Sequence, residues 1–303
     1  MVLLYASCGS MNPYSSVGRG GECYYADWSH CRWSHENQVM EAGHFQSKNN
    51  KFTPMPYCRD KDDWKMDVPL LLAISLIVDP NSEDAKQDRY AMFPTTVRKL
   101  RPENCSTWVL EKMKYARKMC KDKEKQDDIP FNVVSHMSRY GSFWDLQDNI
   151  DLSGLALIIR SGWTFQGDCT SLHYGNDRFF SLKAARASAG HKNTDQKVNS
   201  SSLLEVLEDI DDPTEKKKFF AFCRELMERL PFSHKEGEQL YTLKFILLRA
   251  VFEKYKEILN DIRQWKGDDK YKDVLQLTIE AMLNQHHIAI SDFRGWCSKV
   301  CIF

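Results

Sequence analysis

The stretch DPTEKKKFFAFCRELMERLP, residues 212–231, decides the fold class. It opens with Asp212 and Pro213, and a capping carboxylate followed by proline at the first helical position is typical of a helix start. Apolar side chains then recur at spacings of three and four, which puts them on one helical face. They are Phe219, Phe220, Cys223, Leu226, Met227 and Leu230. Pro231 is expected to end the helix.

The chain after Pro231 continues with helical periodicity. Apolar residues recur there at the same spacings. They are Leu240, Leu243, Leu247, Ala250, Val251, Ile258 and Ile262. A further helix is expected from about Lys270 to Gln285. Because each such helix has one apolar face to bury, residues 203–303 are predicted to form a C-terminal helical bundle.

The apolar run VPLLLAISLIV, residues 68–78, predicts a second long helical feature. Asp67 and Pro69 are helix-start signals. The run has 11 residues, about half of a membrane span, so a buried core helix is expected.

Residues 67–190 as a whole are predicted to form a mainly helical domain. A second helix would place Met113 and Cys120 on one apolar face. A small β element, or an irregular insertion, is expected around residues 155–159. The fold class is therefore expected to be mainly α.

Residues 1–66 have a different composition from the rest. They are rich in Gly, Ser, Asn, Trp and Tyr, and almost no aliphatic residue follows Leu4. Such a segment can hardly bury a core of its own and needs a metal, a disulfide or a partner surface. We therefore expect an irregular N-terminal module, with Pro54 and Pro56 near its exit.

Composition narrows the functional classes. The 42 Lys and Arg residues balance 42 Asp and Glu, whereas dedicated nucleic-acid binders usually carry a basic excess, so any RNA role must rest on a local patch. The apolar start Met1 to Ala6 is too short for a signal peptide, so an intracellular protein of the cytoplasm or nucleus is expected, neither secreted nor membrane-bound. In that reducing environment, the ten cysteines are expected to be buried thiols or metal ligands.

Three of the ten cysteines lie within the first 31 residues, and a histidine follows them closely. These residues are Cys8, Cys23, Cys31 and His35. Three thiolates and one imidazole form a closed tetrahedral set for structural zinc. Three residues separate Cys31 from His35, so both side chains could face one ion from a single helical turn. We therefore expect that one zinc ion could staple the N-terminal module.

These four residues resemble a CCCH-type zinc finger. The ending CRWSH, residues 31–35, is similar to the family's usual ending, and the match covers about 28 residues. The gap of seven residues between Cys23 and Cys31 is slightly long, and the gap of 14 before Cys23 is near the upper limit. His30 or Cys58 could replace one of the expected ligands.

The resemblance implies single-stranded RNA binding. Bases would stack on exposed aromatic rings of the finger. The candidates are Tyr24, Tyr25, Trp28 and Trp33. One finger joined to a helical core is also similar in architecture to the transcription factors of pneumoviruses and filoviruses, which suggests a viral protein.

A local basic patch lies between residues 98 and 125, where ten Lys or Arg accompany four acids. Five of these cations are expected to contact RNA phosphates. They are Lys112, Lys114, Arg117, Lys118 and Lys121. The alternative interpretation is a solvated helix face.

Three functional hypotheses remain open. The first is a non-enzymatic regulatory protein that binds RNA or a protein partner through the zinc-stapled module and the helical domain. The second is a helical interaction or scaffold protein without metal, whose aromatic residues pack against the helical domain. The third is an enzyme of unrecognised family with a site in residues 140–180, where Trp163, Asp168, His173 and Asp177 cluster among glycines. The chain has no Walker loop and no G-x-S-x-G or H-E-x-x-H motif, so the enzyme hypothesis ranks last.

Overall fold

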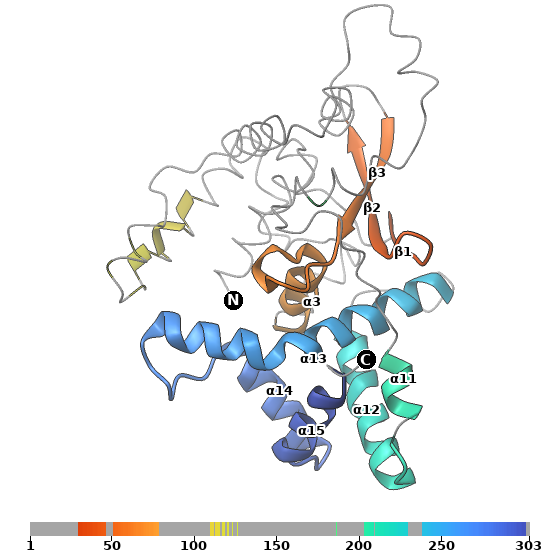
Figure 1. Ribbon diagram of the computed structural model, residues 1–303, viewed down its shortest axis with the longest axis vertical. Coiled ribbons are helices and arrows are strands. Elements are labelled where there is room, and N and C mark those ends of the chain that lie inside the picture. Colours follow the sequence, from red (N-terminus) through yellow and green to blue (C-terminus); the bar gives the residue numbers. More distant parts are fainter. Residues whose placement is uncertain are drawn as a thin grey trace, which may run out of the picture.

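The computed structural model describes residues 30–46, 51–78, 203–208, 210–229 and 238–300, with Arg186 and separate positions between 110 and 126. Figure 1 shows a long helix, α13, that runs across the molecule. A three-stranded sheet and helix α3 lie on one side of α13, and α11, α12, α14 and α15 lie on the other (Figure 1). Helices therefore dominate the described part of the chain, as the sequence predicts.

Helix α12, Pro213–Arg229, confirms the helix predicted from the opening stretch. The N–H of Thr214 donates to Oδ1 of Asp212 at 2.8 Å, so Asp212 caps the helix as predicted. The predicted apolar face is largely correct, but Phe220 is 40% exposed. Phe222 is buried instead, because it lies nearer than Phe220 to the helical face shared by Phe219 and Leu226.

The remaining C-terminal helices are α11 (Leu203–Glu208), α13 (Glu238–Lys266), α14 (Val274–Gln285) and α15 (Ile290–Val300). The helix predicted from about residue 270 begins at Val274, because Oδ2 of Asp273 accepts the N–H of Leu275 at 3.0 Å and caps α14 there. Helix α15 was not predicted from the sequence. It buries Phe293, Trp296 and Cys297, whose spacings of three and four carried the signal.

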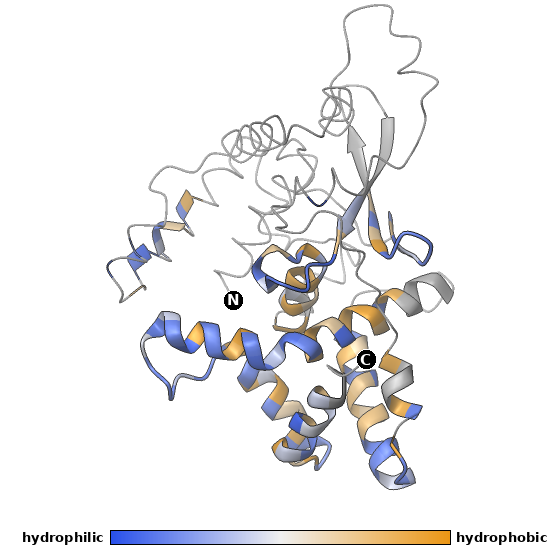
Figure 2. Ribbon diagram, viewed as in Figure 1, coloured by the Kyte–Doolittle hydropathy of each residue, from blue (hydrophilic) through white to orange (hydrophobic). Residues whose placement is uncertain are grey.

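Helix α3, Val68–Val78, has the predicted bounds. The N–H of Leu70 donates to Oδ1 of Asp67 at 3.0 Å, which confirms Asp67 as a start signal. The helix contacts α12, α13 and α14, and also β3 of the sheet. A helix that is apolar on all sides is stable in water only when other elements surround it in this way. Figure 2 shows α3 largely in the hydrophobic colour.

The N-terminal segment is a sheet where it is described, so the prediction of an irregular module is wrong there. Strands β1 (Cys31–Ser34), β2 (Val39–Gln46) and β3 (Lys51–Cys58) form an antiparallel sheet in the order β1-β2-β3. Pro54 and Pro56 lie within β3, an edge strand of this sheet, where a residue without an N–H is tolerated.

One hydrophobic core joins the described parts of all three predicted segments. It includes Trp33, Met40 and Tyr57 of the sheet, the buried apolar residues of α3, and the inner faces of the C-terminal helices. Strand β1 contacts α13, and β3 contacts α3. The sheet is thus stabilised by a partner surface within the same chain, which was one of the three expected solutions for a segment poor in aliphatic residues.

Candidate functional site

The predicted zinc ligands that the structure describes lie in different environments. Cys31 is the first residue of β1 and is 3% exposed, whereas His35 is exposed in the turn that follows β1. The expectation that both face an ion from one helical turn is wrong, because the backbone is a strand there. Cys8 and Cys23 lie outside the described residues.

The substitute ligand Cys58 cannot join Cys31 at one ion. Cys31 pairs with Ala42, whereas Cys58 pairs with Val39. Ala42 and Val39 are three residues apart on β2 and therefore point to opposite faces of the sheet. His30, the other substitute, is exposed. Within the described ranges, no three His, Cys, Asp or Glu residues are grouped as metal ligands.

The aromatic residue at the centre of the predicted finger is not available for base stacking. Trp33 is 4% exposed and lies on the core face of the sheet with Met40 and Tyr57, with which it is in register. Its indole Nε1 is buried without a hydrogen-bond partner. The alternative interpretation, in which this ring packs against the helical domain, describes Trp33 correctly. Tyr24, Tyr25 and Trp28 lie outside the described residues.

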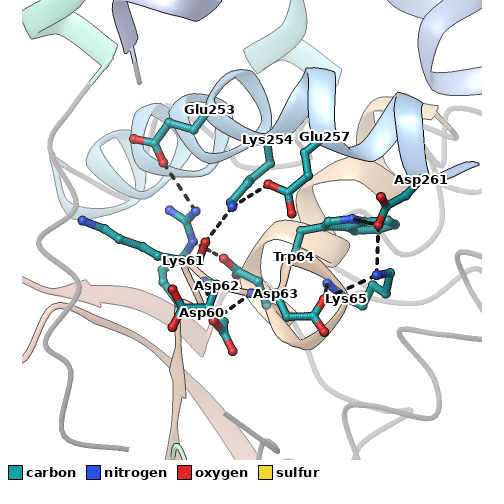
Figure 3. Close-up of polar contacts among 12 residues, drawn as sticks. Asp60, Lys61, Asp62, Asp63, Trp64, Lys65, Glu253, Lys254, Glu257 and Asp261 are labelled. Carbon is teal, nitrogen blue, oxygen red and sulfur yellow. Dashed lines mark hydrogen bonds and ion pairs between the residues drawn. The ribbon is translucent and has the colours of Figure 1, made fainter. Parts of the chain in front are cut away.

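A polar junction joins residues 59–67 to α13 (Figure 3). At its buried end, Arg59 is 3% exposed, and its Nε lies 2.5 Å from Oδ2 of Asp67. Nη2 of Arg59 lies 3.7 Å from Oε2 of Glu253, and Oε1 of the same carboxylate accepts a bond of 3.1 Å from Nε of Arg249. Burial acts to lower the pKa of Arg59, but the carboxylates of Asp67 and Glu253 outweigh it and raise that pKa.

The outer end of the polar junction uses the same face of α13. Nζ of Lys254 donates to the carbonyl oxygen of Lys61 at 2.6 Å. Asp261 accepts from the indole Nε1 of Trp64 at 3.0 Å and pairs with Nζ of Lys65 at 2.9 Å. These contacts tie the segment between the sheet and α3 to the long helix (Figure 3). The contacts of Arg59, Lys254 and Asp261 hold two elements together, so we assign the junction a structural role.

The predicted basic patch has exposed cations where the structure describes it. Residues 110, 111, 113–115, 117 and 118 are helical. Lys114 and Lys118 are exposed, and between them Tyr115 is 48% exposed. Met113 packs against the hydrophobic core, which confirms the predicted apolar face there. Cys120 is buried as well, but it is not itself in the helix. Lys112 and Lys121 are outside the described side chains, and Arg117 is partly buried.

A second group of aromatic and basic residues lies at the C-terminal end of α13. Nζ of Lys266 is 5.1 Å from the ring centroid of Trp265 and 5.3 Å from that of Tyr271. Burial raises the pKa of Tyr271, and Asp273 and Tyr115 raise it further. Tyr115 therefore lies within electrostatic range of Tyr271, although more than 150 residues separate them in sequence.

Trp265, Lys266 and Tyr271 were not among the residues predicted from the sequence. The signal was the alternation of aromatic and basic residues in WKGDDKYK, residues 265–272. The residues proposed for an enzyme site, 140–180, lie outside the described part of the chain. None of the described helices combines the length and apolar character that a membrane crossing requires.

Comparisons of the chain with protein-family models, curated protein sequences and solved structures give no match. The resemblance to CCCH fingers thus stays a prediction from the four residues that suggested it.

Proposed function

We propose that the protein is a non-enzymatic binding protein that contacts single-stranded RNA through the helical surface formed by Lys114, Tyr115 and Lys118. The supporting observation is the exposure of all three side chains. Lys114 and Lys118 are four residues apart, about one helical turn, so they point in nearly the same direction. Cations suit phosphates, and an exposed ring suits an unstacked base.

This proposal moves the stacking role away from the N-terminal finger. Trp33 is in the core, whereas Tyr115 presents nearly half of its surface to solvent. With a net charge of zero, the protein has no broad positive field to attract RNA. Binding then depends on a few stacking contacts and a few phosphate contacts, which predicts a shallow salt dependence.

A titration of labelled mixed-sequence single-stranded RNA, followed by fluorescence anisotropy at several salt concentrations, tests the proposal. Replacing Lys114 and Lys118 with Gln should flatten the log-log salt slope by roughly 0.7 for each lysine. Replacing Tyr115 with Ala should weaken binding by about 1–3 kcal/mol at every salt concentration. The matched control exchanges Lys217 and Lys218, two exposed lysines of α12, for Gln.

A second candidate is the interaction or scaffold protein without metal. The observation that favours it is the burial of Cys31 and Trp33 in a core shared with α13, which gives the finger-like residues a packing role. Wild-type protein that binds RNA no more tightly than about 10⁻⁴ M near physiological salt would leave this candidate in place of the first.

A further inference from the structure

We propose that the C-terminal end of α13 is the second half of the RNA site, with Tyr271 and Trp265 as a stacking platform that continues from Tyr115. This inference rests on the proposed function, because it extends the same surface. It assigns a nucleic-acid role to residues that the sequence pattern did not single out.

The chain reverses direction directly after α13. Gly267 has a φ of 62°, a left-handed conformation that glycine adopts without strain. Its N–H donates to the carbonyl oxygen of Gln264, and the N–H of Asp268 donates to that of Arg263. These two bonds form a Schellman motif. The turn folds the following residues back toward the helix. As a result, Tyr271 contacts Lys266, the same lysine that lies over Trp265 of α13.

The positive charge of Lys266 lies against the aromatic rings at this turn. Its Nζ is over the rings of both Trp265 and Tyr271. An ammonium group beside aromatic faces is well placed to meet the phosphate that follows a stacked base, since base and phosphate are joined by one sugar. Lys266 and both rings are partly exposed.

The 110–118 helical stretch and the C-terminal end of α13 are the two halves of the proposed site. The helical stretch at 110–118 packs on the core through Met113, and in the view of Figure 1 it is drawn near the C-terminal end of α13. Tyr115 contributes to the raised pKa of Tyr271, so the two phenol groups lie within electrostatic range of each other. Two segments that are distant in sequence therefore contribute rings and lysines to the proposed surface.

The charged residues of the proposed surface indicate which kind of ligand it binds and where the surface ends. Lys114, Lys118 and Lys266 all reach solvent, which favours a polyanion over an apolar protein segment. Stacking on rings requires bases that are not paired, so single-stranded RNA fits better than a duplex. Asp268 and Asp269 are exposed at the tip of the turn, and their charges set the limit beyond which the strand does not continue.

The test compares labelled oligouridylates of about 4 and about 12 nucleotides, lengths within the known range of single-strand sites. The full-length wild-type protein should bind the longer strand more tightly. Tyr271→Leu, which keeps an apolar side chain, should weaken binding of the longer strand by about fivefold or more and remove most of the length advantage. Lys266→Gln should flatten the salt slope for the longer strand by roughly 0.7.

Lys256→Gln provides the matched control, because Lys256 is exposed on the same helix and lies outside the proposed surface. It should bind both strands as the wild type does. Thermal unfolding checks that each variant is folded, and Lys266→Gln keeps the test decisive if Tyr271→Leu unfolds.

The outcomes separate the two proposals. If Tyr115→Ala weakens binding while Tyr271→Leu and Lys266→Gln bind the longer strand like the wild type, the site ends at the 110–118 helix and this inference is overturned. If wild-type protein binds neither strand, the proposed function fails with it.

Discussion

Strand β1 and the helical stretch at 110–118 each carry an aromatic residue next to a cation, yet the two rings have opposite surroundings. Trp33 follows Arg32 and is buried against the helical core, whereas Tyr115 follows Lys114 and is exposed. The difference arises from the face that each ring occupies. In β1 the ring shares a face with Met40 and Tyr57, and in the helix the core-facing position belongs to Met113. Neighbours on the same face, more than residue type, decide whether an aromatic ring is buried or exposed.

The largest expected effect tests this comparison directly. Trp33→Ala should lower the free energy of unfolding by about 3–5 kcal/mol, because it leaves a cavity in the shared core. Tyr115→Ala should change that free energy by no more than about 0.5 kcal/mol. Chemical denaturation of both variants measures the two values. Equal losses would mean that Tyr115 is also a packing residue, and the proposed RNA surface would lose its central ring.

An effect of similar size is expected at the polar junction. Arg59→Met leaves the buried carboxylate of Asp67 without its partner, and breaking a buried pair from one side costs about 3–5 kcal/mol. Arg224→Met in the exposed pair with Glu228 is the control, with a loss of about 0.5 kcal/mol or less. Urea denaturation near neutral pH compares them. A small loss at Arg59 would show that the junction does not hold the sheet segment on α13.

Substitutions at the two described zinc ligands are expected to have smaller effects on stability, and the two effects should differ. Cys31→Ser puts a hydroxyl into the core and should destabilise the protein by about 1–3 kcal/mol, whether or not metal is bound. His35 is exposed, so His35→Ala should change stability by about 0.5 kcal/mol or less if packing alone holds the sheet. Thermal unfolding with elemental analysis distinguishes the two accounts. One zinc per chain that both substitutions remove would establish the finger.

The smallest expected effect concerns Glu280, near the turn that follows α13. Burial acts to raise its pKa, but hydrogen bonds from Lys272 at 2.8 Å and Gln276 at 2.7 Å outweigh this and lower it. A carboxyl group with a depressed pKa in the folded state stabilises the fold above its unfolded pKa of about 4.3. That contribution is lost as the pH falls through the folded pKa.

Glu280→Gln should therefore be less stable than the wild type near neutral pH, and the difference should shrink in acid. Urea denaturation at about pH 7 and about pH 3 measures this change. A difference that is constant across this range would assign the effect to shape and hydrogen bonding, with no part for the charge.

Helices were predictable here because their signals are local. Asp212, Asp67 and the apolar spacing after each of them lie within a few residues of the helix they specify. The sheet was not predictable, since the pairing of Cys31 with Ala42 and of Val39 with Cys58 depends on register between separate strands. That register, more than the spacing of cysteines, determines which thiols can meet.

The candidate RNA surface was predictable only in part, for the same reason. Lys114 and Lys118 stood out as part of a basic run. Tyr271 did not, because its place beside Tyr115 depends on the turn at Gly267 and on how the 110–118 helix packs. Trp33 was assigned the wrong environment because its neighbours across the sheet are distant in sequence.

The prolines of β3 have a consequence for self-association. An edge strand with a complete set of N–H donors is a template on which a strand from another copy can add, and such addition leads to fibres. Pro54 and Pro56 are two residues apart, so the donors that they lack belong to the same edge of β3. A fourth strand would find two consecutive gaps in the ladder. Growth of the described sheet across its β3 edge is therefore disfavoured by covalent structure.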